Sequence, residues 1–407
     1  MKQIPGGVTA PKGFRAWGVH CGVKSKKADK KDLTLILSDQ ECAAAAVYTM
    51  NRVKAAPLYV TMEHLEDGTA WGVAANSGNA NACCPMSHEY AEEMARLAAR
   101  ATGRAPADFV VASTGVIGQT LNIAAIRAGM PEAAAGLTAG PEGSDAAARA
   151  IMTTDTVKKE LALACSIGGR TVTLGAIAKG SGMIHPNMGT MLCFVTTDCA
   201  ITREMLSEAL HEVVPRTFNR VTVDGDTSTN DMCAVLANGM AGNPLIEWKD
   251  DGYTVFLKAL RQLCQELARA IAGDGEGASR LITCAVREAR SEESAERLAK
   301  AVVGSSLVKA AMFGADANWG RVLCAMGYSK APFRPEYVDI SFSSAVGAVA
   351  VCRGGMGLDF DEEAARSILS QDEVVIDVHL HEGEHEATCW GCDLTYDYVK
   401  INGDYRT

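Results

Sequence analysis

The chain has 407 residues, of which 48% are hydrophobic and 22% charged, and this composition is typical of folded globular proteins. Its formal net charge of -10 lacks the basic excess expected of a protein that coats nucleic acid. The first residues lack the apolar core of a signal peptide, and no apolar run approaches the ~18 residues of a membrane helix, so we expect a cytoplasmic protein.

Apolar periodicity predicts strands and helices that alternate along the chain. In chain order these are a strand at 33–37, a helix at 88–101, a strand at 109–112, short broken helices within 124–150, strands at 171–177 and 191–196, helices at 205–214, 255–271 and 292–312, and a strand at 374–380. This mixture predicts a layered α/β architecture. The 14 cysteines are spread through the chain, many in apolar segments, which favours free thiols in the core over a disulfide framework.

Two loops resemble ligand-binding motifs without matching them. The glycine-rich run from Gly273 to Gly277 follows a predicted helix, whereas a dinucleotide-binding loop follows a strand. The run that begins at Asp224 has Thr229 and Val235 where a calcium loop needs glycine and glutamate. We therefore exclude both assignments.

Five potential zinc ligands lie close together near the C-terminus: His379, His381, His385, Cys389 and Cys392. They are chemically reasonable metal ligands, but Cys389-Trp390-Gly391-Cys392 is a C-x-x-C that no second C-x-x-C accompanies. The alternative is a β-hairpin, with strands at 374–381 and 387–392 joined by a turn. We prefer the hairpin and expect no metal.

The segment 179–194 contains the pattern that points to chemistry. A predicted strand leads into Lys179 and a Gly-Ser-Gly turn, and Gly189 then precedes Thr190 at the start of a second apolar strand. A small residue before threonine suits self-cleavage, in which the threonine hydroxyl attacks the preceding carbonyl. The new α-amino group, with a reference pKa of about 7.7–8.0, then serves as a base for its own hydroxyl. On its own, Gly-Thr is also compatible with an ordinary strand start.

Motifs along nearly the whole chain resemble those of the ornithine acetyltransferase family of arginine biosynthesis, also called glutamate N-acetyltransferase. They are the segments 6–14, 76–83, 113–118, 152–156, 179–194, 222–231, 273–278, 313–321 and 390–395, with Asn402 and 405–407 at the end. One departure is Gly189, where the family usually has alanine. Both residues are small, so we expect cleavage to survive.

The resemblance implies a fold and a division of the chain. The fold is α/β, a layered αββα sandwich of the self-cleaving N-terminal-nucleophile type with a smaller C-terminal α/β subdomain. Cleavage between Gly189 and Thr190 would give fragments 1–189 and 190–407, which form one catalytic unit. Two copies of each fragment are expected to assemble as a heterotetramer.

The resemblance also implies a role for each site residue. Thr190 is the nucleophile, and Thr114 and Gly115 form the oxyanion hole. The residues implied in substrate binding are Thr153, Lys179, Thr190, Glu276, Asn402 and Thr407. A Lys179 ammonium suits the substrate α-carboxylate, and a Glu276 carboxylate suits the side-chain ammonium of ornithine. Thr154 remains an alternative to Thr153, and His185 is interpreted as a loop residue because the nucleophile carries its own base.

The implied reaction is a ping-pong transfer of the acetyl group of N-acetylornithine to glutamate, with no cofactor. Acetyl-CoA as a second acetyl donor remains open. Two further alternatives are an aminopeptidase or amidase of the same fold and a binding protein without activity. A Glu276 placed for ornithine favours transfer over hydrolysis.

Overall fold

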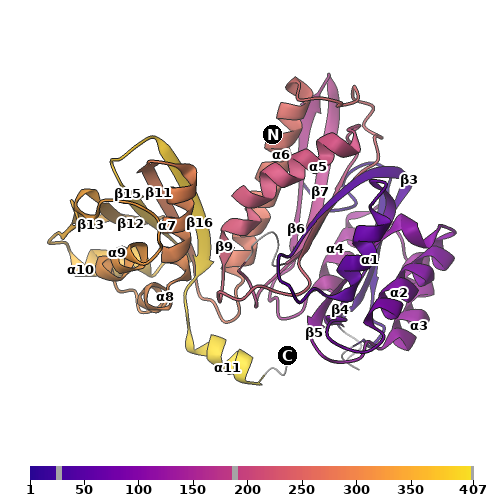
Figure 1. Cartoon of the computed structure of the whole chain (residues 1–407), viewed down its shortest axis with the longest axis horizontal. Helices are drawn as coiled ribbons and strands as arrows, with labels where there is room; N and C mark the ends of the chain where they lie inside the picture. Colours follow the sequence, from indigo (N-terminus) through magenta and orange to yellow (C-terminus); the bar gives the residue numbers. More distant parts are fainter. Residues whose placement is uncertain (24–29, 186–190, 405–407) are drawn as a thin grey trace.

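The computed structural model describes residues 1–23, 30–185 and 191–404. These residues form two α/β units, a larger one that contains most of the first 273 residues and a smaller one built from the later part of the chain (Figure 1). Among the described residues, no helix has both the length and the apolar character needed to cross a membrane.

The larger unit is built on a nine-stranded sheet, counted over the described residues. Its strands are β1 (Lys2–Ile4), β2 (Phe14–Val19), β3 (Leu33–Tyr48), β4 (Thr69–Asn79), β5 (Phe109–Val116), β6 (Lys159–Ile167), β7 (Arg170–Lys179), β8 (Leu192–Thr197) and β10 (Met232–Ala237). Their order is β1-β6-β7-β8-β10-β3-β4-β5, and β2 also pairs with β3. The helices of this unit are α1 (Ala56–His64), α2 (Ser87–Thr102), α3 (Ile123–Ala135), α4 (Pro141–Ile151), α5 (Arg203–Val213) and α6 (Asp251–Gly273).

The long strand β3 divides this sheet into two layers. Its first part, Leu33 to Leu37, pairs with β2 and β4, and its second part, Ala43 to Tyr48, pairs with β10. The pairing of β3 with β4 is irregular between Leu37 and Cys42, as expected where a strand bends. One strand therefore takes part in both layers.

Three apolar cores confirm the αββα sandwich. The central core joins Ile36, Val73 and Val110 of one layer to side chains of β7, β8 and β10 in the other. The outer face of β7, β8 and β10 packs against α5 and α6, and the outer face of β3, β4 and β5 packs against α2 and α3. Helices thus cover both outer faces of the two stacked sheet layers.

The helix α6 shows how local sequence produces these layers. The carboxylate of Asp250 caps its first turn by accepting a hydrogen bond from the Tyr253 amide at 2.8 Å. Leu260, Leu263 and Leu267 then recur at helical spacing, and all are buried. The predicted helix at 255–271 is confirmed, as are those at 88–101 and 205–214.

The smaller unit has a seven-stranded sheet among the described residues, in the order β14-β13-β12-β15-β11-β16-β9. Its strands are β9 (Val221–Thr222), β11 (Leu281–Ala289), β12 (Asp339–Ser344), β13 (Gly347–Arg353), β14 (Met356–Gly357), β15 (Glu373–His379) and β16 (His385–Cys392). Its helices are α7 (Glu292–Gly304), α8 (Ser306–Phe313), α9 (Trp319–Gly327) and α10 (Glu362–Leu369). They share one core with the sheet, which confirms the smaller C-terminal α/β subdomain.

Two local predictions in this unit were wrong. The predicted helix at 292–312 is interrupted at Ser305, whose hydroxyl caps the next helix, α8, by accepting a hydrogen bond from the Val308 amide. The predicted hairpin does not form, because β11 lies between β15 and β16. Ile282 of β11 pairs with Val374 on one side and with Gly391 on the other.

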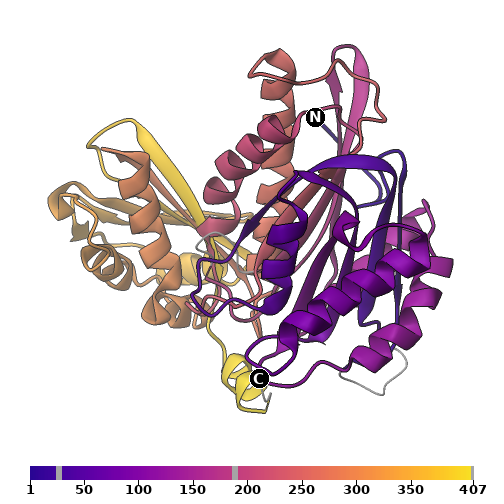
Figure 2. The ribbon, with the colours of Figure 1, turned by 45° about the vertical axis from the view of Figure 1, so that its right-hand side comes forward.

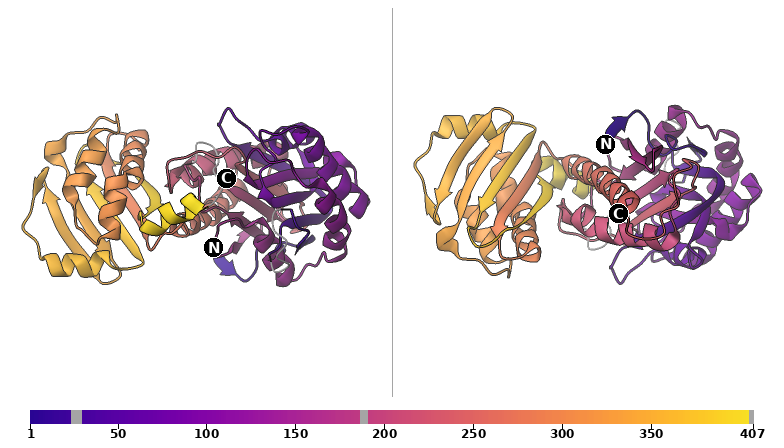
Figure 3. Two further views of the ribbon diagram at one scale, coloured as in Figure 1. Left: turned by 90° about the horizontal axis from the view of Figure 1, so that it is seen from below. Right: turned by 90° about the horizontal axis from the view of Figure 1, so that it is seen from above.

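The chain ends in helix α11 (Tyr396–Asp404), which leaves the smaller unit and runs back toward the larger one (Figures 1 and 2). Seen from below, α11 lies between the two units (Figure 3). This path brings the end of the chain to the junction where the candidate site is found.

Candidate active site

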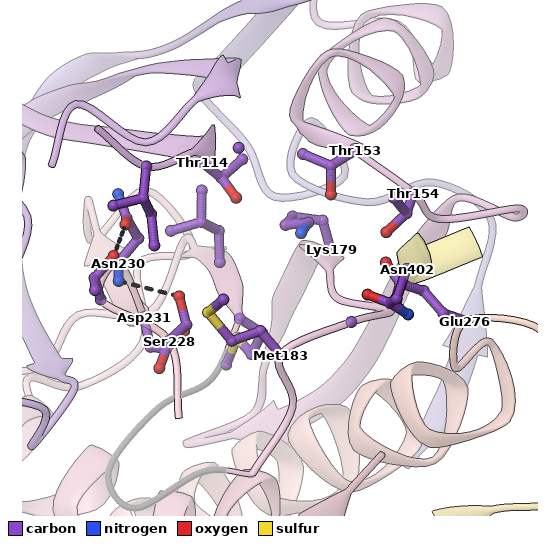
Figure 4. Close-up of a pocket in the computed structure, with 16 residues that line it drawn as sticks. Thr114, Thr153, Thr154, Lys179, Met183, Ser228, Asn230, Asp231, Glu276 and Asn402 are labelled. Carbon is purple, nitrogen blue, oxygen red and sulfur yellow. Dashed lines mark hydrogen bonds between the residues drawn. The ribbon is translucent and has the colours of Figure 1, made fainter. Parts of the chain in front are cut away.

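One cavity brings together six of the residues implicated by the sequence: Thr114, Gly115, Thr153, Lys179, Glu276 and Asn402 (Figure 4). They come from β5, the segment after α4, the end of β7, the loop after α6, and α11. The remaining lining residues are Ile117, Thr154, Gly182, Met183, Met191, Leu192, Ser228, Thr229, Asn230 and Asp231. Gly189, Thr190 and Thr407 lie outside the described residues.

Thr114 and Gly115, the pair implied as an oxyanion hole, lie within β5, and close packing explains why the second is glycine. Gly115 has φ +133°, and a Cβ there would come within 2.4 Å of the Gly78 carbonyl carbon. The amide of Asn230 fixes the strand just before this pair by donating hydrogen bonds to the carbonyls of Ser113, at 2.8 Å, and Ala80, at 2.6 Å. The backbone at Thr114 is therefore held in place from two sides.

Lys179 presents a buried cation to the cavity. Its Nζ lies 3.9 Å from the Asp155 carboxylate. Burial lowers the pKa of Lys179, and Asp155 opposes this shift. Burial by itself would raise the pKa of Asp155, but the ammonium groups of Lys179 and Lys159 outweigh that effect and hold the pKa well below its usual range. Asp155 is thus a carboxylate that favours the charged form of Lys179.

Asp155 also orders the backbone on both sides of the cavity. Its carboxylate accepts hydrogen bonds from the Gly180 amide at 2.7 Å and from the Thr153 amide at 3.0 Å. Lys159 joins Asp155, at 2.7 Å, to Asp274, at 2.6 Å, and all three side chains are almost completely buried. This network ties β6 and β7 to the loop that carries Glu276.

Glu276 reaches the cavity because the residue opposite it has no side chain. A Cβ on Gly182 would lie 2.4 Å from the carboxylate carbon of Glu276. The Glu276 amide donates to the Ser181 carbonyl at 3.0 Å, and its carboxylate accepts a hydrogen bond from Asn402 at 2.8 Å. The turn after β7, the loop after α6 and the C-terminal helix therefore meet around one carboxylate.

Gly277 lets the C-terminal segment approach so closely. It has φ +68°, and a Cβ there would lie 2.6 Å from the Tyr398 amide nitrogen. The Thr395 hydroxyl also donates to the Gly277 carbonyl at 2.6 Å. The terminal segment therefore folds back against the loop that carries Glu276, and Asn402 lines the cavity.

Thr153 and Thr154 both line the cavity, so both stay candidates for the threonine that contacts the substrate. In Figure 4, Thr154, Glu276 and Asn402 lie to one side of Lys179, while Thr114, Ser228 and Asp231 lie to the other. The cavity thus has two ends, with a cation between them.

Asp231 is a site residue that sequence reasoning did not single out. It is only 2% exposed, and its Oδ2 atom has no hydrogen-bond partner among the described residues. Burial raises its pKa well above the usual range. The next residue, Met232, donates its amide to the Met191 carbonyl at 2.9 Å, so Asp231 lies beside the start of β8. The only sequence signal was its place in the motif 222–231.

Three residues that the sequence analysis did not assign to the site, His185, Cys389 and Cys392, do not line the cavity. The Nδ1 atom of His185 lies 3.0 Å from the Thr222 hydroxyl, and burial lowers the pKa of His185 to about 4. Cys389 and Cys392 are buried in β16, and all 14 cysteines are free thiols. Within the described ranges, no three His, Cys, Asp or Glu side chains are grouped so that they could hold a metal ion.

The αββα fold, with a cavity lined by hydroxyl, ammonium and carboxylate groups, is the one expected of an acyl-transfer enzyme of the N-terminal-nucleophile type. The chain belongs to the ArgJ family, whose model matches residues 15–407. Membership confirms the resemblance found in the sequence, and the relatives that match over the whole chain are arginine biosynthesis proteins.

Relatives of known name match the chain along its whole length. The arginine biosynthesis bifunctional protein ArgJ of Symbiobacterium thermophilum is 55% identical over 408 residues, which cover 100% of both chains. The ArgJ protein of Bacillus subtilis is 45% identical over 100% of this chain and 98% of its own.

Two solved structures match about half of the chain each. The ArgJ protein of Bacillus halodurans is 46% identical with a TM-score of 0.50, over 52% of this chain and 98% of the solved chain. The ornithine acetyltransferase of Mycobacterium tuberculosis, complexed with ornithine, is 39% identical with a TM-score of 0.42, over 46% of this chain and 98% of the solved one.

Proposed function

We propose that the chain cleaves itself between Gly189 and Thr190 and then transfers acetyl groups from N-acetylornithine to glutamate through an acetyl-Thr190 intermediate. The observation that carries this proposal is the convergence of six implicated residues on a cavity also lined by Met191 and Leu192, which follow Thr190 in the chain. Fragments 1–189 and 190–407 would both contribute to this cavity.

The two ends of the cavity suit the two parts of the substrate. At one end, Thr114 and Gly115 would stabilise the oxyanion formed when the Thr190 hydroxyl attacks the acetyl carbonyl. At the other end, Glu276 would pair with the side-chain ammonium of ornithine. Lys179, between them, would bind the α-carboxylate that ornithine and glutamate share.

Proton transfer in this mechanism uses the nucleophile's own amine. The α-amino group of Thr190 takes the hydroxyl proton during attack and gives it to the departing nitrogen of ornithine, which leaves acetyl-Thr190. Glutamate then attacks the acetyl ester through its neutral α-amine, and the proton it loses returns to the threonine oxygen. No cofactor is required for either half-reaction.

The comparisons with solved relatives support cleavage. Each solved chain is matched over 98% of its own length, but the match covers only 52% or 46% of this sequence. Each solved chain is therefore about half as long as this one. A family whose members separate into two fragments would give matches of this kind. We extend the proposal to an assembly of two fragments of each type, located in the cytoplasm, where 14 free thiols would stay reduced.

Acetyl-CoA is the proposed second acetyl donor, because the named relatives are bifunctional arginine biosynthesis proteins. Hydrolysis by a related aminopeptidase or amidase activity is less well supported. The Glu276 carboxylate, held by Asn402, offers a fixed partner for an amine-bearing substrate rather than a site for water.

Denaturing electrophoresis with intact-mass analysis tests cleavage, and an assay of N-acetylglutamate formation tests transfer. The expected result is two fragments, the second beginning at Thr190, and N-acetylglutamate formed from N-acetylornithine and from acetyl-CoA. Thr190→Ala is expected to remain one chain without activity. A single full-length mass from active enzyme would refute the nucleophile assignment, and release of free acetate without acceptor would favour hydrolysis.

A further inference from the structure

Met183 lines the cavity in a backbone conformation that is unfavourable for methionine. Its φ is +57°, in the left-handed region that glycine adopts easily and other residues rarely do. The residue before it is already glycine, so the chain places a large side chain where a second glycine would be easier to accommodate. Such a conformation needs support from its surroundings.

The support comes from Asp224. Its carboxylate accepts hydrogen bonds from the Met183 amide at 2.6 Å and from the Ile184 amide at 2.9 Å. The Ile184 side chain is buried, and its carbonyl accepts a hydrogen bond from the Val223 amide at 2.7 Å. The backbone of Met183 is therefore fixed, and its side chain is held at the cavity wall.

The wall of the cavity is polar apart from a small set of side chains. The apolar ones are Ile117, Met183, Met191 and Leu192. Met191 and Leu192 are almost completely buried, at 4% and 1% exposure, whereas Ile117 and Met183 are only half-buried. Ile117 and Met183 are thus the two of these four apolar side chains that are less completely buried.

Met183 also lies at the end of the cavity where the acyl group is expected. In Figure 4 it is on the same side of Lys179 as Ser228 and Asp231, and Glu276 and Asn402 are on the opposite side. The proposed oxyanion hole, Thr114 and Gly115, lines this part of the cavity. The methyl of an acetyl group is apolar, so it needs an apolar contact near the oxyanion hole.

We infer that Met183 is a specificity-determining residue that limits the acyl group to acetyl. Asp224 fixes the backbone that carries this side chain, and the side chain forms a wall that the acetyl methyl touches and that propionyl or butyryl groups would overlap. This inference rests on the proposed acyl transfer. It concerns the size of the transferred acyl group, whereas Lys179 and Glu276 are proposed to recognise the charged groups of the substrate.

The inference is tested with Met183→Gly and Met183→Ala in the self-cleaved enzyme that contains both fragments. The donors are N-acetyl-, N-propionyl- and N-butyrylornithine, and the acceptor is glutamate. The ratio of kcat/KM for propionyl to that for acetyl is expected to rise about 10- to 200-fold, the usual discrimination for one methylene in an apolar pocket. Met183→Gly is also expected to raise the thermal unfolding midpoint, because glycine adopts this φ without strain.

Lys330→Gly is the matched control, because Lys330 also has a positive φ, +64°, and does not line the cavity. It should raise the unfolding midpoint without changing the donor ratio. An unchanged donor ratio in both Met183 variants would overturn the inference, as would a change confined to the KM of glutamate. Absence of acetyl transfer by the unmodified enzyme would instead refute the proposed function.

Discussion

The side-chain amide of Asn402 donates a hydrogen bond to the carboxylate of Glu276 at 2.8 Å, and so connects the last helix of the chain to the loop after α6. Glu276 as a whole is 8% exposed and lines the cavity. A buried carboxylate needs such partners, and one free oxygen can still accept a substrate ammonium. This contact makes the end of the chain part of the candidate site.

Replacing Glu276 by glutamine is expected to reduce kcat/KM for N-acetylornithine by roughly tenfold to a hundredfold, the usual loss when a charged hydrogen-bond partner is removed. Self-cleavage should continue, because the role proposed for Glu276 is to pair with the substrate ammonium and not to act at the cleaved bond. Steady-state kinetics and electrophoresis measure the two effects. Glu293→Gln, at an exposed position on α7, is the control. Unchanged kinetics in Glu276→Gln would remove Glu276 from the site.

Gly115→Ala is expected to lower acetyl transfer by about a hundredfold to a thousandfold, the cost of losing one oxyanion-hole donor. An added Cβ would lie 2.4 Å from the Gly78 carbonyl carbon and 2.5 Å from the Asn79 amide nitrogen, so the strand end must move. Gly118→Ala separates this effect from backbone strain, because Gly118 has φ +78° and no atoms within 4 Å of its Cβ position. The control should lose about 1–2 kcal/mol of stability and little activity. Equal activity losses in the two variants would contradict the assignment.

Sequence patterns located several strands but not their full length, and β3 shows why. The pattern indicated a strand only at 33–37, because the next residues are polar and those after them are mostly alanine, a weak strand former. The strand continues to Tyr48 because Ala43 to Tyr48 pair with β10, almost 200 residues later in the chain. The wrongly predicted hairpin has the same cause, since β11 lies far from both β15 and β16 in the sequence.

The residues of the candidate site also differ in whether the sequence alone identified them. Thr114, Lys179 and Glu276 were identified through their motifs, and all three line the cavity. Asp231 and Met183 lie within the motifs 222–231 and 179–194 but were not singled out, because nothing in those motifs marks them as cavity residues. Their importance depends on which side chains surround them, and that depends on contacts between distant strands and loops.

Asp155→Asn tests the buried charge network. Removal of this carboxylate leaves Lys179 without the carboxylate it pairs with, and it removes one of the two carboxylates that pair with Lys159. A loss of about 3–5 kcal/mol of stability is therefore expected at neutral pH. The pKa of Asp155 is depressed in the folded state, so its contribution is present above its unfolded pKa of about 3.9 and is lost as the pH falls below it. Urea denaturation at several pH values should therefore show a difference between wild type and variant that shrinks on acidification.

Asp145→Asn is the matched control for that measurement. Asp145 pairs with Arg149 at 2.9 Å and with Lys158 at 2.6 Å, but its side chain is 34% exposed. Solvent screens these pairs, so the variant should lose at most about 1 kcal/mol. A small loss in Asp155→Asn, similar to that of the control, would show that the buried network does not stabilise the site.

Removing residues 402–407 is expected to abolish acetyl transfer while the protein stays folded and cleaved. The helix α11 has no fully buried side chain, so shortening it exposes no apolar core. The truncation does remove Asn402, the hydrogen-bond partner of Glu276.

Gly277→Ala tests the same contact without truncation, because its Cβ would lie 2.6 Å from the Tyr398 amide nitrogen and would push α11 away. Gly242→Ala, with φ +69° and open space around its Cβ position, controls for strain. Circular dichroism checks folding, and transfer from N-acetylornithine to glutamate checks function. Near-normal turnover by the truncated protein would show that the terminal helix covers the site without contributing to it.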